Sequence, residues 1–386
     1  MEQPPASDAA DWSKLPADIL TTVMCALEFP DLFNSAAACT SWRATARALR
    51  RLGGTYSRPQ TPCLFYTSPT GAELYSLAAG KSYRLPDIPD PLLLLNPATG
   101  EQIGLPPIAT IEQVTPVHDD AGSLQRYELS FYDATLPRKE LQPPVPYEVG
   151  ELREVLYLKV ILSGDPSRGD CTAMLIHNPD RQLSFARVGG EQWHWITTSP
   201  KHTEYSDCIY QDGVFYAMTR QGGIHRYTIS GSSASCEVVF KNILPFMAYN
   251  VYIARASSGD VLQIWRYIGL PSEETKEMRT DGFEIFKLDF DKQCIVKANT
   301  LGDDALLIGH SYTCCLSTKD YPKLLPSHVY FTDDSEYWPL ENKNCRRDVG
   351  ICNLEEESFG DLVSPQPWLN WPNPIWIMPS FTKINQ

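Results

Sequence analysis

The chain has 386 residues, of which 43% are hydrophobic and 21% charged, a composition typical of a folded globular protein and not of a disordered one. Its formal net charge of −14 argues against a nucleic-acid partner, because phosphate binding requires a basic surface. This length accommodates one large domain or two ordinary ones.

The first elements along the chain are helical. Residues 1–11 are expected to form a flexible N-terminus, and residues 12–52 a helical domain. Ser13 is a candidate cap for the first helix, and the missing N–H of Pro16 suits a first helical turn. The apolar side chains of this helix recur at helical spacing, at Ile19, Leu20, Val23, Met24 and Leu27.

Two further helices follow. Asp31 is the candidate cap of the second, and Thr40 or Ser41 caps the third, whose terminal arginines complement the negative end of the helix dipole. A unit of about 40 residues is at the lower limit for a self-sufficient core. Part of its apolar surface is therefore expected to be buried, against either a partner protein or the domain that follows.

The order of three pieces within this unit resembles the F-box, the helical module that docks a protein onto the Skp adaptor of a cullin ubiquitin ligase. The pieces are Leu15–Leu20, Asp31–Phe33 and Cys39–Arg43. The segment Asn34–Ala38 departs from the family, because it is smaller and more polar than the usual leucine- or valine-rich run, which implies a weaker adaptor affinity. The resemblance implies that the adaptor-binding residues are Leu15, Pro16, Ile19, Leu20, Val23, Leu32, Cys39 and Trp42.

After Arg51 the helical periodicity is lost. Gly53-Gly54 and Ser57–Pro62 mark residues 53–62 as a linker. Residues 63–386 are rich in aromatic and β-branched residues and are interrupted by Gly, Pro, Asn and Asp, which predicts about twenty short strands and almost no long helix. This region is therefore expected to be all-β.

Several segments of this region repeat a hairpin pattern. Cys208–Ala217 is typical of a strand, an Asp-Gly turn and a strand, and Asn250–Tyr267 is a second copy. Hairpins that recur over roughly 330 residues favour a β-propeller, whose blades of about 40 to 50 residues give about six or seven. A pair of two-sheet sandwiches is the alternative fold.

The region also resembles a plant family of F-box proteins with a C-terminal KIB-type β-propeller, long described as a domain of unknown function. Together the two resemblances cover nearly the whole chain. They imply a multi-domain protein, with a small all-α F-box followed by an all-β propeller. The pieces that carry the second resemblance, in order, are Tyr205–Asp207, Gly213–Ala217, Phe283–Asp289, Leu301–Leu306, Gly309, Val329–Asp334, Gly350–Glu356 and Pro374–Trp376.

A search for reactive or metal-binding constellations predicts none. The sequence lacks a GxxxxGK[ST] phosphate-binding loop. Asp303-Asp304 and Asp333-Asp334 offer oxygen ligands for a divalent cation, but such pairs at strand ends are expected to be solvated turns. Trp193 and Trp195 face the same way on a strand and are expected to pack in the core. No catalytic residue, metal or cofactor is predicted.

Cysteine usage and the apolar runs indicate the compartment. The 11 cysteines form no CxxC pair, so neither a disulfide framework nor a zinc site is indicated, and scattered thiols are typical of a reducing compartment. Met1–Asp11 lacks the features of a secretory or transit peptide, and runs such as Leu92–Leu95 are too short to cross a bilayer. We therefore expect cytoplasmic and/or nuclear localisation and no membrane partner.

The family resemblance implies a non-catalytic function, the substrate-recognition subunit of an SCF-type cullin ubiquitin ligase. The helices would bind the Skp adaptor, and through it a cullin, and propeller loops would bind an unknown target protein. Candidate loops are Pro137–Glu154 and Leu270–Gly282. The alternatives are a non-ligase interaction scaffold, whose helices serve internal packing, and an enzyme at the propeller channel, which the absence of a catalytic constellation disfavours.

Overall fold

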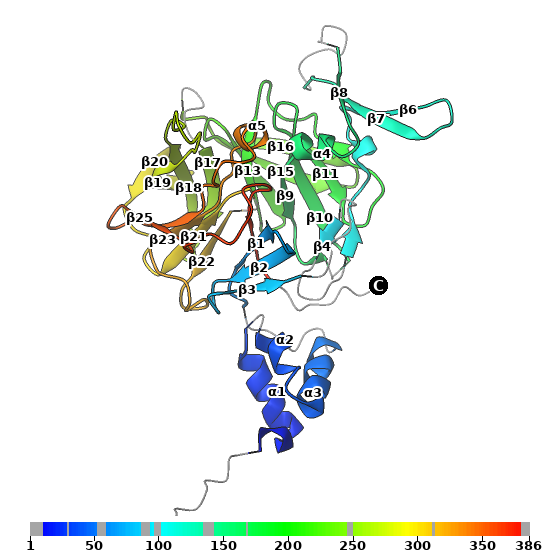
Figure 1. Cartoon of the computed structure of the whole chain (residues 1–386). Helices are drawn as coiled ribbons and strands as arrows, with labels where there is room; N and C mark the ends of the chain where they lie inside the picture. The colour runs from blue at the N-terminus through cyan, green and yellow to red at the C-terminus, as the bar shows by residue number, and fades with distance from the viewer. Residues whose placement is uncertain are drawn as a thin grey trace, which may run out of the picture.

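The computed structural model shows a helical module beneath a ring of β-sheets (Figure 1). Part of the predicted linker (53–58) and part of the first candidate loop (137–142) lie outside the described residues. The structure describes residues 11–28, 31–51, 59–85, 93–95, 102–133, 143–166, 169–244, 250–310 and 313–379.

The helical module has the three predicted α-helices in the predicted order. The 3-10 helix η1 (Trp12–Lys14) precedes α1 (Ala17–Ala26), α2 (Asp31–Ser35) and α3 (Thr40–Arg51). The expectation that Ser13 caps the first helix is wrong. Its hydroxyl donates to the carboxylate of Asp11 within η1, and α1 starts after Pro16 without a side-chain cap.

One apolar cluster joins the helical module to the first sheet of the β-domain. It brings buried side chains of all three helices against β1 (Cys63–Ser68) and β2 (Gly71–Ser76). The module is thus seated on the β-domain and completes a core that it is too small to form alone. The buried members of the cluster are Met24, Leu32, Ala46, Leu49, Cys63 and Leu74.

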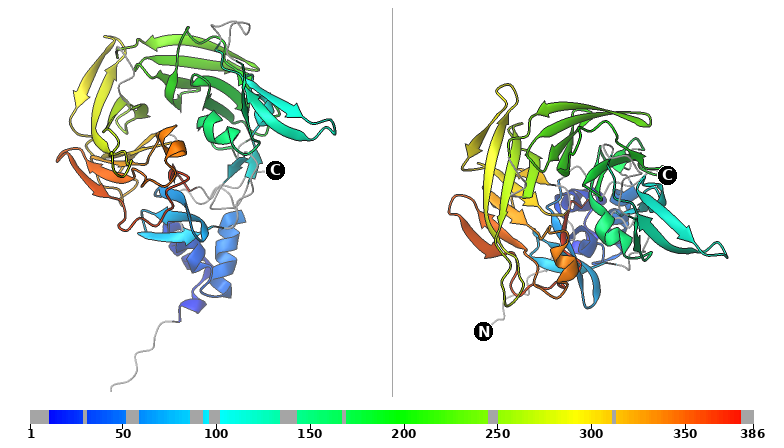
Figure 2. Two further views of the ribbon diagram at one scale, coloured as in Figure 1. Left: turned by 45° about the horizontal axis from the view of Figure 1, so that its top comes forward. Right: turned by 90° about the horizontal axis from the view of Figure 1, so that it is seen from above.

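Five sheets of four or five strands surround a central axis in the described part of the chain (Figure 2). The first contains β1, β2, β3 (Lys81–Arg84) and the late strand β26 (Ile375–Ile377). Leu64 of β1 lies opposite Trp376 of β26 in an antiparallel pair. The start and the late part of the β-domain are therefore joined in one blade, which closes the ring.

The next three blades are antiparallel, and each has its strands in chain order across the sheet or in the reverse of that order. Their strands are β9 (Tyr157–Leu162), β10 (Thr172–His177), β11 (Gln182–Arg187) and β12 (His194–Trp195); β13 (Tyr205–Gln211), β14 (Val214–Thr219), β15 (Ile224–Ser230) and β16 (Ser233–Phe240); and β17 (Asn250–Arg255), β18 (Val261–Ile268), β19 (Thr280–Asp289) and β20 (Cys294–Ala298).

The fifth blade is irregular. Its strand order is β22-β21-β23-β24-β25, and β21 pairs with β23 in parallel. Its strands are β21 (Asp304–Ile308), β22 (Cys314–Ser317), β23 (His328–Phe331), β24 (Gly350–Asn353) and β25 (Ser358–Asp361).

Smaller elements fill the stretch between the first and second blades. The two-stranded sheet of β4 (Leu93–Leu95) and β5 (Gln102–Gly104) takes the place of a sixth blade in chain order. A three-stranded sheet then projects from the ring (Figure 1). Its strands are β6 (Val114–His118), β7 (Leu124–Leu129) and β8 (Val145–Tyr147), and the short helices η2 (Ile108–Thr110) and α4 (Leu152–Leu156) lie in the same stretch. Another short helix, α5 (Trp338–Glu341), lies between β23 and β24 of the fifth blade.

The core lies between neighbouring blades, which supports the propeller over a sandwich pair. Ile161 of β9 and Phe185 of β11 pack against Tyr205 and Phe215 of the following blade, and similar clusters join the third blade to the fourth and the fourth to the fifth. The predicted Asp-Gly hairpin tip is confirmed, because Asp212-Gly213 has positive φ at both positions, as a type I′ turn requires. No helix in the described ranges is long and apolar enough to span a membrane.

Candidate docking sites

The first candidate site is an exposed apolar face on α1. Pro16, Ile19 and Val23 are spaced by three and four residues, so they share one side of the helix. Ile19 is 46% exposed and Val23 37%. We call these three residues the docking stripe. The free chain leaves this stripe facing solvent, which is typical of a surface that a partner covers.

The other predicted adaptor-binding residues lie deeper. Leu20 and Leu32 are each 1% exposed and hold the helices together, so they cannot contact a partner directly in this arrangement. Leu15, Cys39 and Trp42 are half-buried. The structure thus divides the eight residues into an exposed stripe, a half-buried margin and two core positions.

The start of α1 is fixed by α3. The indole N–H of Trp42 donates to the carbonyl of Trp12 at 3.0 Å, and the hydroxyl of Ser41 donates to the carbonyl of Ser13 at 3.2 Å. These bonds clamp η1 against α3. Because Pro16 follows η1 directly, the clamp also sets where the docking stripe begins.

The second candidate site is the face of the propeller away from the helices, which we call the distal face. The segment 332–349, between β23 and β24, bridges several blades there. Lys343 pairs with Glu154 of α4 at 3.1 Å, and the Trp338 indole donates to the carbonyl of Lys276 at 2.8 Å. The segment is therefore anchored to elements far from it in the sequence.

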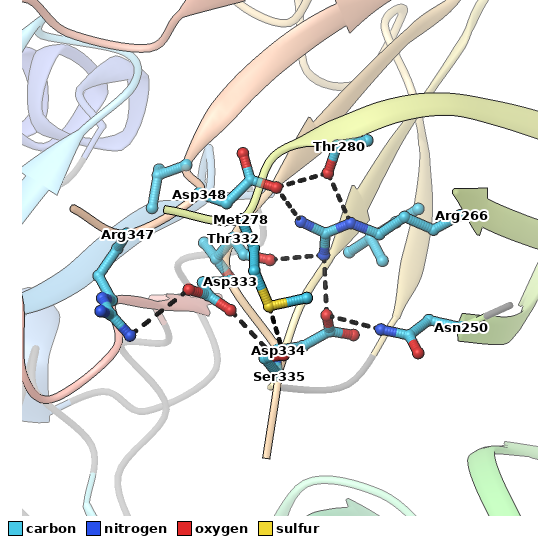
Figure 3. Close-up of polar contacts among 12 residues, drawn as sticks. Asn250, Arg266, Met278, Thr280, Thr332, Asp333, Asp334, Ser335, Arg347 and Asp348 are labelled. Carbon is cyan, nitrogen blue, oxygen red and sulfur yellow. Dashed lines mark hydrogen bonds and ion pairs between the residues drawn. The ribbon is translucent and has the colours of Figure 1, made fainter. Parts of the chain in front are cut away.

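A buried ion network fastens this segment from below (Figure 3). Arg266 of β18 is 1% exposed, and its guanidinium pairs with Asp334 at 2.9 Å and with Asp348 at 3.0 Å. It also donates to the Thr280 hydroxyl and the Thr332 carbonyl, each at 2.8 Å. A buried guanidinium with this many acceptors satisfies its charge and its hydrogen-bonding capacity.

The expectation that Asp333-Asp334 forms a solvated turn is wrong. Asp334 is tied to Arg266, and Asp333 is 7% exposed beside Arg347. Burial raises the pKa of Asp333 to about 6, in spite of the nearby guanidinium of Arg347. For Asp334, burial acts in the same direction and is the largest single effect, but the charge of Arg266, the hydrogen bond from Tyr252 and nearby cations together outweigh it, so the pKa of Asp334 lies below its ordinary value.

In the other aspartate pair, Asp303-Asp304, one residue is exposed and the other is buried. Asp303 lies at the surface and pairs with Lys319, whereas Asp304 is 3% exposed and accepts a hydrogen bond from the backbone N–H of Ser257 at 2.8 Å. The solvated-turn expectation is therefore wrong for Asp304. No local signal marked Asp304 and Asp334 as buried, because their partners Ser257 and Arg266 belong to the fourth blade.

A second buried pair ties the inner strands together. Lys159 of β9 and Asp207 of β13 lie 3.2 Å apart, with side chains 7% and 0% exposed. The other carboxylate oxygen of Asp207 accepts from the backbone N–H of Ile253 in β17 at 3.1 Å. Three blades thus share one buried carboxylate, which makes the ring beneath the distal face rigid.

The distal face is made of loops that are anchored to the blades. The part of the chain that the structure describes has no group of three or more His, Cys, Asp or Glu able to hold a metal. Leu270 is 94% exposed and Tyr337 60%, so both reach solvent on anchored segments. Trp193 is 2% exposed, as predicted for a core residue.

The candidate loops map only partly onto this face. In the second, Leu270–Gly282, the last three residues already belong to β19. In the first, Pro137–Glu154, the described part carries β8 and the start of α4, with Val145 38% and Val149 45% exposed.

Three comparisons relate the chain to known proteins. A family model described as the KIB1-4 beta-propeller matches residues 76–353. The Arabidopsis thaliana protein named "Putative F-box protein At5g55150" is 21% identical over 384 residues, covering 94% of this chain and 96% of that protein. The solved structure "YCF48 bound to D1 peptide" shows 15% identity and a TM-score of 0.24, covering 62% of this chain and 66% of that chain, just under two thirds of its length.

Proposed function

The chain belongs to the KIB1-4 β-propeller family, and from that premise we propose that it is the substrate-recognition subunit of an SCF-type cullin ubiquitin ligase. The match along nearly its whole length to a protein named as an F-box protein supports this role. The observation that carries the proposal is the docking stripe, an exposed apolar helix face on a module seated on the propeller.

In this proposal residues 12–52 form the docking module and residues 63–386 the recognition domain. The docking stripe binds the Skp adaptor, and the adaptor connects the protein to a cullin. The propeller holds a target protein, whose effective concentration near the ubiquitin-charged enzyme rises because both are tethered to one complex. The chain itself supplies position and orientation and no bond chemistry.

The distal face is the proposed target-binding surface. It lies at the end of the ring opposite the helical module (Figure 1), so a target there would not compete with the adaptor for space. Leu270 and Tyr337 are two large, exposed side chains on the loops of this face. Loops on a rigid scaffold are the usual carriers of recognition.

The proposal also assigns a compartment. The protein would act in the cytoplasm and/or nucleus, where a reducing environment keeps free thiols such as its 11 cysteines in the reduced state.

The test is a pull-down of purified full-length protein with the Skp adaptor. The double variant Ile19→Ser with Val23→Ser removes apolar contact area from the stripe, and we expect its adaptor affinity to fall by at least about tenfold. The matched control is Val296→Ser with Leu325→Ser, which removes similar side chains, 56% and 49% exposed, from the propeller surface.

The control must bind as the wild type does. Absence of binding by folded wild-type protein, or equal binding by the stripe variant and the control, would contradict the ligase role.

A non-ligase interaction scaffold is the second candidate. Asn34, Ala37 and Ala38 are exposed beside the module's helices, and these small side chains give a partner little apolar area. A scaffold would retain target binding at the distal face while showing no affinity for the adaptor.

A further inference from the structure

The proximal end of the propeller channel, where β9, β13 and β17 end, contains a pocket of about 560 Å³. It is lined by the last residues of these strands, by β22 and by Leu94 of β4. This volume lies within the range of small-molecule sites in proteins. The pocket is separate from the distal ion network, because Arg255 ends β17 whereas Tyr252, nearer its start, contacts Asp334.

The wall of the pocket is mainly apolar. Water in such a space would find few hydrogen-bonding partners. Its displacement by an apolar organic group would therefore make a favourable contribution to the binding free energy. The distal end of the channel differs, because there a gap of only about 30 Å³ lies among paired charges. The apolar side chains of the wall are Leu94, Val160, Ile161, Leu162, Cys208, Ile209, Tyr210, Cys314 and Cys315.

One polar group in the wall has no hydrogen-bond partner. The hydroxyl of Thr313 is buried and unpaired, and the residue is only 3% exposed. The atoms around this oxygen shield it from the pocket, so Thr313 adds no polar contact for a ligand and the wall remains mainly apolar.

Among the described residues that line the pocket, Arg255 is the one that carries a charge. Its side chain is 45% exposed, and its guanidinium pairs with Asp212 at 3.8 Å, which is longer than a hydrogen bond. A guanidinium binds planar anions through paired, charge-assisted hydrogen bonds. Since no carboxylate is found among the described residues that line the pocket, its charge favours an anion.

We propose that this proximal pocket is a binding site for a small organic anion with an apolar body, held by Arg255 at its charged end and by the apolar wall along its length. The volume sets the size of the body, and the apolar wall excludes a bare inorganic anion as the best occupant. Binding at this pocket does not depend on adaptor binding, so a test of the pocket and a test of the ligase role give independent results.

The test uses two fluorescent probes on the purified full-length chain. The anion 8-anilinonaphthalene-1-sulfonate and the neutral N-phenyl-1-naphthylamine share one apolar body and differ in the sulfonate. We expect saturable 1:1 binding of the anion. Arg255→Gln should weaken anion binding by about tenfold and change binding of the neutral probe by less than about twofold.

Two further variants sharpen the assignment. Asp212→Asn removes the carboxylate that competes for Arg255 and should tighten anion binding, and Asn tolerates the positive φ of this turn position. Thr313→Val keeps the shape of the side chain and should leave the binding of both probes unchanged, because the hydroxyl that it removes is shielded from the pocket. Unchanged circular dichroism and thermal unfolding establish that each variant is folded.

The control for binding elsewhere is the stripe variant Ile19→Ser with Val23→Ser, which should bind both probes as the wild type does. The proposal is overturned if folded wild-type protein shows no saturable binding. It is also overturned if the stripe variant abolishes the signal, or if Arg255→Gln affects the two probes equally.

Discussion

The helical module and the propeller differ in which side chains they bury. The propeller takes charged side chains into its interior, with Arg266 at 1% exposure, while the module leaves Ile19 at 46% exposure on its surface. Buried charges and exposed apolar faces are the informative exceptions to ordinary burial. In the propeller the buried charges hold distant blades together, and in the module the exposed apolar face is the surface that we propose a partner covers.

The largest effect should follow from breaking the buried network. Arg266→Met leaves Asp334 and Asp348 buried without their cation, so we expect the free energy of unfolding to fall by roughly 3 to 5 kcal/mol. Urea unfolding of the variant measures this loss. The control is Lys287→Met, because Lys287 pairs with Asp260 at 2.7 Å on the protein surface. Its loss should lower the free energy of unfolding by no more than about 1 kcal/mol. Equal losses would refute the distinction between the two pairs.

A substitution at the junction of the helical module and the propeller should have the next largest effect on stability. Met24 is 0% exposed and packs in the cluster that joins α1 to β1 and β2. Met24→Ala creates a cavity there and should cost about 2 to 5 kcal/mol. Limited proteolysis should then release the helical module before it cuts the propeller. Simultaneous digestion of both regions would mean that they unfold as one unit.

A smaller, pH-dependent effect is expected from His177. Its ring is fully buried, and burial lowers its pKa from 6.5 to about 4. Between these values the unfolded chain binds a proton that the native chain does not, so this residue makes the protein less stable as the pH falls, by about 1.4 kcal/mol per pH unit. Urea unfolding from pH 7 to pH 4.5 should show a shallower loss for His177→Gln. Parallel curves for variant and wild type would contradict this assignment.

The smallest effect on stability is expected in the docking stripe. Ile19→Ser removes a side chain that the folded chain does not bury, and should change the free energy of unfolding by no more than about 0.5 kcal/mol. Thermal unfolding measures this change. A loss of several kcal/mol would place Ile19 in the core and remove the docking stripe.

The local part of this architecture could be predicted from the sequence, and the long-range part could not. Apolar spacing predicted α1, and the Asp212-Gly213 pair predicted a hairpin tip, because both depend on neighbours in the chain. The network around Arg266 was missed, because its partners lie 68 and 82 residues further along. The same reason explains Asp304, which looked like a turn residue and is buried in the fifth blade.

The docking stripe shows the limit of the family resemblance. The resemblance named eight residues without separating those that face outward from those that fill the module. Leu20 and Ile19 are adjacent and similar in chemistry, yet one is 1% exposed and the other 46%. Only the packing of α1 against its neighbours decides between them.

The pairing of β1 with β26 has a consequence for the order of events during synthesis. β1 carries Cys63, on which the helical module is seated, and its partner strand is made more than 300 residues later. A chain released before residue 375 has the complete docking stripe but an unfinished first blade beneath it. Translation must therefore reach β26 before the blade that supports the stripe is complete, which favours full-length chains over truncated ones in the complex that we propose.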